Sequence, residues 1–202
     1  MGRTLIAGIV AVLVPVHAFA AGPYVSLTGG AAFLEDSDLE GNGFDGEAEF
    51  DAGFVISGAA GYGFDGVALG TVRTEVEIAY RQNDLDQISA FGVTVSGGDA
   101  DVSALSGMAN VALDVATGTI VEPYVFVGIG AANVNLESDD LNVDEDDTVF
   151  AYQAGAGLGF ALTETITLFT GYRFFGATDP EFEGVDAEYR SHNFEAGVRV
   201  HF

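Results

Sequence analysis

Hydrophobic and polar side chains alternate with a period of two along most of this 202-residue chain. The alternation is clearest at the carboxyl end, where an apolar set interleaves with a polar set. The apolar set is Ala196, Val198, Val200 and Phe202, and the polar set is Glu195, Gly197, Arg199 and His201. Because successive side chains of a strand point to opposite faces, this pattern predicts a strand whose two faces contact different media. It fits a soluble sheet that covers a core, or a membrane barrel with lipid outside and a polar lumen.

Eight such segments follow one another along the chain, and each is long enough for a tilted membrane strand of roughly nine to eleven residues. They are Tyr24–Leu34, Gly53–Phe64, Gly70–Arg81, Val102–Val115, Val121–Leu136, Phe150–Leu162, Thr165–Phe175 and Ser191–Phe202. An even number of antiparallel strands is typical of bacterial membrane barrels. The predicted fold class is therefore all-β, an eight-stranded antiparallel up-and-down transmembrane β-barrel.

The connections between these segments alternate between long and short. The long ones span residues 35–52, 82–101, 137–149 and 176–190, and the short ones lie near Asp65–Leu69, Ala116–Ile120 and Thr163–Glu164. The long connections hold 24 of the 31 Asp and Glu residues, so acid gathers at one end of the predicted barrel. A soluble barrel of the lipocalin kind shares the strand count but gives no reason for this asymmetry. We therefore expect four long acidic extracellular loops and short periplasmic turns.

The first twenty residues have the features of a secretory signal peptide. Arg3 precedes an apolar run from Leu5 to Val16, and Ala18-Phe19-Ala20 matches the small-x-small pattern of a cleavage site. The run is too short to span a bilayer as a helix, which needs roughly 20 residues. We expect residues 1–20 to direct export through the Sec pathway and to be removed, and residues 21–202 to form one β-barrel domain.

Composition narrows the possible functions. The chain has no cysteine, so a disulfide framework and thiolate metal sites are both excluded. It carries a formal net charge of −25, contains no lysine, and has no basic stripe interleaved with aromatic residues. Because such a surface repels a polyanion, nucleic acid is not an expected partner. The acidity itself fits either a cation-attracting surface or solubility in a salty environment.

Charged residues within the predicted strands are expected to point into the lumen, because an arginine facing lipid near the midplane costs on the order of 2–4 kcal/mol. The predicted lumen charge network consists of Arg73, Glu75, Glu77, Arg173, Glu195 and Arg199. An eight-stranded barrel is just wide enough for its side chains to fill it. We therefore predict a paired, hydrogen-bonded plug, and we favour a structural role over a proton or solute relay, since buried charges need partners whatever the function.

Small and aromatic residues support the same geometry. Gly155, Gly157 and Gly159 share an inward face, where they make room for the Arg and Glu side chains opposite. The strand before it has two apolar faces, and we assign its aliphatic set (Val125, Val127, Ile129 and Ala131) to the lipid. Aromatic residues gather toward strand ends and predict two girdles at the headgroup levels. They are Tyr62, Phe64, Phe160 and Phe202 near the short turns, and Phe33, Phe54, Tyr80, Phe150, Tyr172, Phe174 and Phe194 near the long connections.

Two sequence patterns resemble sites with known chemistry. The stretch from Asp36 to Glu47 superficially fits a calcium loop of the EF-hand type, but strands rather than helices flank it, and Glu40 stands at the fifth position, where Asp or Asn is usual. We expect no specific metal or cofactor, and at most loosely bound divalent cations at the acidic loops. Ser191 and His192 suggest a lipid hydrolase, yet neighbours in a strand point to opposite faces, and His201 lies at the other end. We therefore expect no enzyme activity.

The chain resembles the outer-membrane β-barrel domain family that includes opacity-type surface antigens and small porin-family proteins. The resemblance spans the chain after residue 20 and rests on Tyr24–Ala31, Arg73–Arg81, Pro123–Gly130, Tyr152–Gly157, Gly171–Phe175 and the terminal strand. It implies an integral protein of the cell outer membrane of a Gram-negative cell, in contact with outer-membrane lipid and lipopolysaccharide. The ending, with Glu195, Gly197, Val200 and Phe202, looks like the signal recognised by the barrel-assembly machinery, an expected partner during biogenesis.

This fold carries several kinds of function, so the resemblance implies no reaction. We expect a structural or surface-interaction protein whose outer loops present an acidic surface to a possible extracellular ligand. The alternative is a narrow porin-like channel for small solutes or ions, in which Arg73, Arg173 and Arg199 face Glu75, Glu77 and Glu195 at a constriction.

Overall fold

The computed structural model describes residues 21–35, 37–41, 44–50, 52–67, 69–90, 93–96, 100–138, 143–178, 181–182, 185–186 and 189–202. Side chains are described within 21–35, 52–64, 69–83, 102–135, 148–178 and 189–202. The predicted signal peptide lies outside these residues, and so do the side chains of the calcium-like stretch and of most acidic positions in the long connections.

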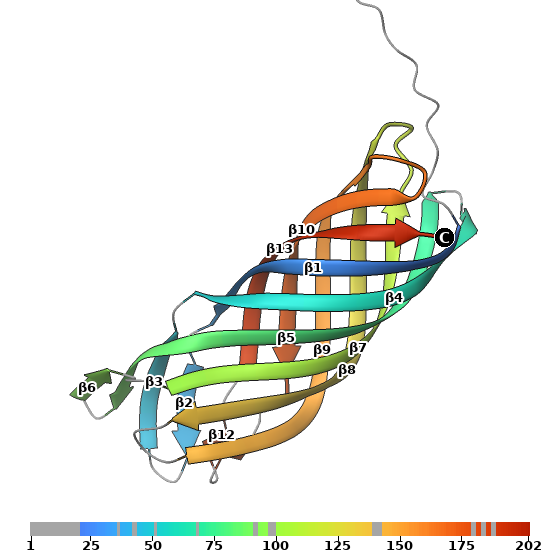
Figure 1. Cartoon of the computed structure of the whole chain (residues 1–202). Coiled ribbons are helices and arrows are strands. Elements are labelled where there is room, and N and C mark those ends of the chain that lie inside the picture. The colour runs from blue at the N-terminus through green and yellow to red at the C-terminus, as the bar shows by residue number, and fades with distance from the viewer. Residues whose placement is uncertain are drawn as a thin grey trace, which may run out of the picture.

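Eight long strands form the wall of the molecule (Figure 1). They are β1 (Gly22–Leu34), β4 (Gly53–Val67), β5 (Gly70–Ala90), β7 (Ala100–Val115), β8 (Val121–Ser138), β9 (Val143–Ala161), β10 (Ile166–Ala177) and β13 (Tyr189–His201). Each pairs antiparallel with its two neighbours, and the pairing of β1 with β13 joins the two ends of the chain. The predicted eight-stranded, up-and-down antiparallel barrel is therefore confirmed, and it is closed.

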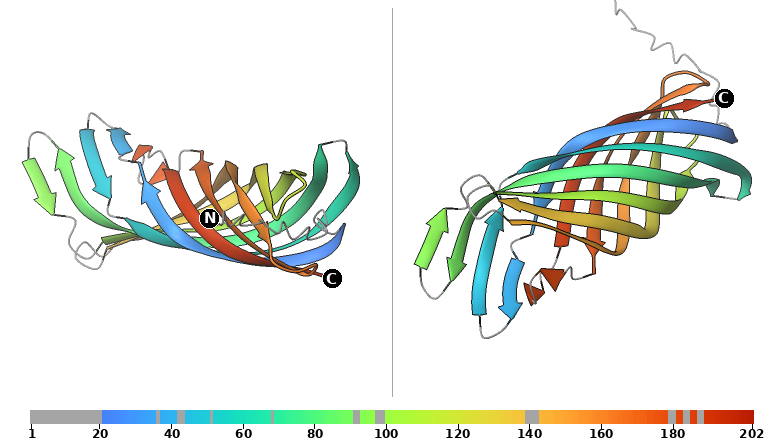
Figure 2. Two further views of the ribbon diagram at one scale, coloured as in Figure 1. Left: turned by 90° about the horizontal axis from the view of Figure 1, so that it is seen from above. Right: turned by 60° about the horizontal axis from the view of Figure 1, so that its bottom comes forward.

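The long connections contain short strands that the hydrophobic pattern did not predict. They are β2 (Ser37–Gly41), β3 (Phe44–Phe50), β6 (Val93–Ser96), β11 (Glu181–Phe182) and β12 (Val185–Asp186). Together with the far end of β5 they form a second sheet in the order β6-β5-β3-β2-β12-β11. Figures 1 and 2 place this sheet beyond the end of the barrel opposite the carboxyl terminus. The connections were expected as loops, but β5 continues past the barrel, and its free backbone groups pair with the neighbouring segments.

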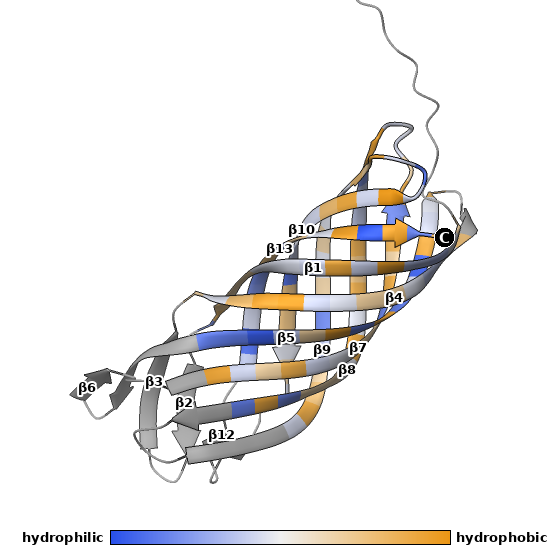
Figure 3. Ribbon diagram, viewed as in Figure 1, coloured by the Kyte–Doolittle hydropathy of each residue, from blue (hydrophilic) through white to orange (hydrophobic). Residues whose placement is uncertain are grey.

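Side chains alternate between the two faces of the wall as predicted. Outward residues are mostly aliphatic and exposed, for example Val76, which is 68% exposed, and Val127, which is 62% exposed. Many inward residues on the same strands are polar and buried, for example Arg73, which is 2% exposed. Figure 3 shows the resulting hydropathy changes along each barrel strand. This arrangement is the reverse of a water-soluble protein and suits a hydrocarbon surrounding. The described residues contain no helix long and apolar enough to cross a bilayer.

The lumen has two layers that differ in polarity. The half near the long connections holds a hydrophobic cluster of Val102, Ala104, Met108, Ala132, Val134, Ala151, Phe175, Ala177 and Tyr189. The half near the short turns holds Arg73, Glu75, Asp114 and Arg199, which lie toward the turn-side ends of their strands, while Arg173 and Glu195 lie nearer the middle of the barrel wall. The charged layer is predicted from the sequence pattern, whereas the apolar layer is not. The apolar layer packs over the charges and separates them from the end of the barrel that carries the second sheet.

Candidate functional site

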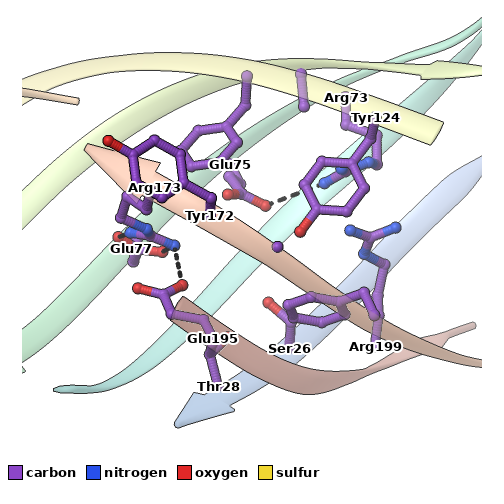
Figure 4. Close-up of a pocket in the computed structure, with 14 residues that line it drawn as sticks. Ser26, Thr28, Arg73, Glu75, Glu77, Tyr124, Tyr172, Arg173, Glu195 and Arg199 are labelled. Carbon is purple, nitrogen blue, oxygen red and sulfur yellow. Dashed lines mark hydrogen bonds and ion pairs between the residues drawn. The ribbon is translucent and has the colours of Figure 1, made fainter. Parts of the chain in front are cut away.

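The six residues predicted as the lumen charge network all line one small cavity between β1, β5, β7, β8, β10 and β13 (Figure 4). Arg73, Glu75 and Glu77 project from β5, Arg173 projects from β10, and Glu195 and Arg199 project from β13. The cavity has a volume of about 30 Å³, which is room for about one water molecule. The charged side chains therefore nearly fill the space that they surround.

One half of the network centres on Arg73. Its guanidinium binds Asp114 in a bidentate manner, with Nε donating to Oδ2 at 2.6 Å and Nη2 donating to Oδ1 at 3.0 Å. Its Nη1 donates to Glu75 at 3.3 Å and to the hydroxyl of Tyr24 at 3.1 Å, and that hydroxyl donates to Glu75 at 2.7 Å. Arg199 approaches Asp114 at 3.8 Å. Two arginines and two carboxylates thus balance each other in this half.

The other half centres on Arg173. Its guanidinium binds both oxygens of Glu77, with Nη2 at 3.0 Å from Oε2, and the same Nη2 lies 3.1 Å from Oε2 of Glu195. Nη1 also donates to the side-chain oxygen of Gln153 at 3.0 Å. One arginine therefore holds two carboxylates that come from strands on different sides of the lumen.

Two amide side chains join the halves into one network. Gln153 on β9 donates to Glu77 at 3.2 Å and to Asn110 on β7 at 2.7 Å. Asn110 in turn donates to Glu75 at 3.1 Å. Hydrogen bonds consequently run across the lumen between strands that are not neighbours in the sheet, which ties the wall of the barrel together from inside.

Aromatic rings fill the remaining space around the guanidinium groups. Arg73 lies over the rings of Tyr24 and Tyr124, at 5.5 and 5.9 Å from their centroids. Arg173 lies 5.1 Å from the centroid of Phe126. A Cβ at Gly157 would lie 2.5 Å from the Tyr124 hydroxyl. The inward glycines were expected to make room for Arg and Glu side chains, but the room is taken by aromatic rings that contact the arginines.

Arg81 lies at the boundary between the charged and apolar layers. It is 0% exposed, and its Nη1 donates to the hydroxyl of Ser106 at 3.0 Å. Its guanidinium carbon lies 3.9 Å from the centroid of Phe175. The Nε and Nη2 atoms have no hydrogen-bond partner among the described residues. Arg81 therefore differs from Arg73 and Arg173, whose guanidinium groups each bind carboxylates.

Several residues that complete the network are not among the six predicted from the sequence, namely Tyr24, Arg81, Asn110, Asp114 and Gln153. The alternation of side chains along each strand could have identified two of them. Arg81 has the same parity as Arg73 on β5, and Asp114 has the same parity as Asn110 on β7, so each pair shares a face.

The residues of the predicted assembly signal occupy different environments in β13. Glu195 belongs to the network, and Gly197 leaves room for the ring of Phe169. Val200 faces outward beside Val25, its partner on β1, and Phe202 is 76% exposed. The backbone nitrogen of Phe202 donates to the carbonyl of Pro23 at 3.0 Å, which fixes the chain end against the first strand.

Ser191 and His192 lie on opposite faces of β13. The Ser191 side chain is buried in the lumen and donates to Asn193 at 3.1 Å, whereas His192 is partly exposed on the outer face. His201 is buried at the other end of the strand. Within the described part of the chain, no group of three or more His, Asp or Glu side chains is placed to hold a metal ion.

Comparison with known proteins places the chain in a family. A family model described as the outer membrane protein beta-barrel domain matches residues 4–202. No curated protein sequence matches the chain significantly.

Among solved structures, Neisserial surface protein A (NspA) is similar to this chain, with a TM-score of 0.58 and 20% identity over 90% of this chain and 98% of that one. The outer membrane protein OprG from Pseudomonas aeruginosa gives a TM-score of 0.60 and 14% identity over 92% and 99% of the two chains. At these identities the likeness concerns the fold. The predicted location in the outer membrane is confirmed by the family match, and the chain belongs to the outer membrane protein beta-barrel domain family.

Proposed function

We propose that this protein is a plugged outer-membrane barrel with a structural or surface-interaction role, in which the lumen serves stability and the long connections carry recognition. The observation that carries the proposal is the filling of the lumen. The arginine and carboxylate groups bind each other and leave a cavity of only about 30 Å³. A hydrated ion or a small solute needs a continuous wider path, and the apolar layer above the charges adds a second obstruction.

A second candidate, a narrow channel, is favoured by one specific observation. The Nε and Nη2 atoms of Arg81 and Oε1 of Glu195 have no hydrogen-bond partner among the described residues. The hydrogen-bonding capacity of the network is therefore not fully used near Arg81. If the ion pairs rearranged, these atoms of Arg81 and Glu195 could form new hydrogen bonds.

Conductance in planar bilayers separates the two candidates. For a plugged barrel we expect no steady single-channel steps from the native protein. Arg173→Ala removes the group that holds Glu77 and Glu195 together, so it is the variant most suited to open a path. Val127→Ala, which changes only the outward face, is the matched control. Steady steps from the native protein that change in Arg173→Ala and persist in Val127→Ala would establish the channel instead.

The proposed surface role requires that the long connections face outward from the cell. Protease added to intact cells should then cut within residues 35–52, 82–101, 137–149 or 176–190, because these connections are the accessible ones in that orientation. Mass spectrometry of the fragments locates the cuts. Cleavage confined to the short turn at residues 116–120, or to the one at residues 163–165, would reverse the orientation.

A further inference from the structure

The second sheet ends in a strand that has a partner on one side only. β6 stands at one end of the order β6-β5-β3-β2-β12-β11, and within the described part of the chain its backbone pairs with β5 alone. Their register runs from Ala90 opposite Val93 to Gln87 opposite Ser96. Backbone groups of an edge strand point alternately toward and away from its neighbour, so about half of those in β6 are directed at the free side. Figure 2 shows β6 at the periphery of the molecule, clear of the barrel wall.

β6 has few of the features that keep an edge strand from pairing further. Such edges are commonly protected by charged residues, proline or a bulge. β6 reads Val-Thr-Val-Ser, and the β5 segment that pairs with it, Gln87–Ala90, is also free of charge and proline. The register between the two strands is continuous. Valine and threonine also favour an extended backbone. The short length of β6, four residues, is its main protection, and it sets the length of the strand that fits.

Four acidic residues form one row across four neighbouring strands near this edge. Each is the register partner of the next, and they are Asp84 on β5, Asp101 on β7, Glu137 on β8 and Asp144 on β9. Like charges at directly opposed positions destabilise a sheet. The chain contains no lysine, and its net charge is −25. A positively charged group from outside would therefore relieve the repulsion along this row, which we call the acidic row.

The acidic row adjoins the free side of β6. β6 and β7 pair with the same edge of β5, one after the other, since Ser96 and Asp101 lie opposite Gln87 and Asp84. β8 pairs with the far side of β7 only as far as its own last residue, Ser138. The free side of β6 therefore begins where β8 ends. A strand added to β6 would continue the line of β8, and its barrel-side end would meet the acidic row.

The charge of the chain determines which kind of strand fits this place. A second copy of the protein carries the same net charge of −25, so repulsion opposes its approach. A segment with lysine or arginine at its barrel-side end is attracted by the acidic row instead. Antiparallel pairing is slightly more stable per residue than parallel pairing. A strand antiparallel to β6 runs away from the barrel, as β5 does, so its basic residues come before its uncharged stretch.

We propose that the free side of β6 binds an extended peptide segment as an added strand, with basic residues at the amino end of that segment against the acidic row. The inference rests on the proposed function, because it names the partner of the surface role given to the long connections. Backbone hydrogen bonds to Val93–Ser96 hold the segment, and the ion pairs set its direction. An anionic segment or a rigid helix does not meet both requirements.

A synthetic peptide of alternating valine and threonine, preceded by lysines and carrying a fluorophore, tests the proposal. It is titrated into the full-length processed protein in phosphatidylcholine nanodiscs, and binding is followed by fluorescence anisotropy. The matched control has the same composition with its lysines at the carboxyl end. We expect the first peptide to bind more tightly than the control, and added salt to weaken it. Equal affinity of the two peptides, or unchanged affinity after N-methylation of the peptide backbone, would overturn the proposal.

Hydrogen exchange and two variants then locate the contact. The bound peptide should slow amide exchange in fragments that cover β6 and leave those that cover β11 unchanged. Glu137→Gln should weaken binding about threefold, the effect of losing one exposed ion pair. Glu181→Gln, the same change at the opposite end of the second sheet, should have no effect. Binding without slower exchange in β6, or equal losses in both variants, would contradict the proposed site.

The remaining outcomes separate the occupants and the two proposals. Slower exchange in β6 that increases with protein concentration in the absence of peptide would assign the edge to a second copy, and it would overturn the inference. The peptide assay uses purified protein with both ends of the barrel accessible, so it does not depend on orientation in the cell. Conductance and protease mapping report on the proposed function separately, which makes the two failures distinguishable.

Discussion

Arg73 and Arg81 point into the lumen from the same face of β5, but their surroundings differ. Arg73 has a bidentate carboxylate partner in Asp114, with both oxygens used. Arg81 has the Ser106 hydroxyl and the face of Phe175. Sequence periodicity predicts only that both arginines face inward. It does not predict which side chain each arginine contacts. The partners lie on other strands, and the position of those strands along the barrel axis is fixed only when the sheet closes.

Removing one member of the Arg73–Asp114 pair should be costly. Arg73→Ala leaves Asp114 buried with only the more distant Arg199 beside it, so we expect the free energy of unfolding to fall by about 3 kcal/mol. Urea unfolding in lipid vesicles measures the change, and Val76→Ala on the lipid-facing side of β5 serves as the control.

The double variant Arg73→Met/Asp114→Leu removes both charges and should recover much of the loss, because a buried pair is often replaceable by apolar groups. A double variant as unstable as Arg73→Ala would show that the remaining contacts of Arg73, to Tyr24 and Glu75, carry the stabilisation instead.

At the scale of the strand, the period of two was sufficient to place the wall and to orient its faces. The aliphatic set of β8, including Val127 and Ile129, faces outward as predicted even though both of its faces are apolar. The end of β5 was not predictable in the same way. Its apolar alternation weakens after Arg81, yet the strand continues to Ala90 because β3, β6 and β7 pair with it. The pairing with β3 depends on a segment that is distant in the sequence, which a local pattern does not contain.

The outward face of β8 gives a test of depth. Val127→Arg should lower the free energy of unfolding by roughly 2–4 kcal/mol, because Val127 lies near the middle of the apolar band. Ile120→Arg, at the short turn before the same strand, should cost about 0–1 kcal/mol, since its charge reaches the headgroups. Both are measured by urea titration of vesicle-inserted protein. Equal costs at the two positions would mean that the band is not centred where the exposed aliphatic residues indicate.

The whole molecule is a closed ring whose interior contacts connect strands from all parts of the chain. The network described above takes groups from β1, β5, β7, β9, β10 and β13. Closure should make the folded protein resistant to SDS at room temperature. We expect an unboiled sample to migrate differently on a gel from a boiled one, because only heat opens the ring. Identical migration of both samples would argue against a closed barrel under those conditions.

The pairing of β1 with β13 has a consequence for how this protein is made. Glu195 and Arg199 belong to β13, so Arg173 and Asp114 receive these contacts only once β13 is in place and the ring is closed. A polypeptide that lacks β13 would leave Arg173 with one carboxylate partner, Glu77, and Asp114 with one arginine partner, Arg73. It would also present two open sheet edges. Incomplete products are thereby disfavoured both by weaker ion pairing and by unpaired backbone groups, which gives biogenesis a built-in check on the integrity of each copy.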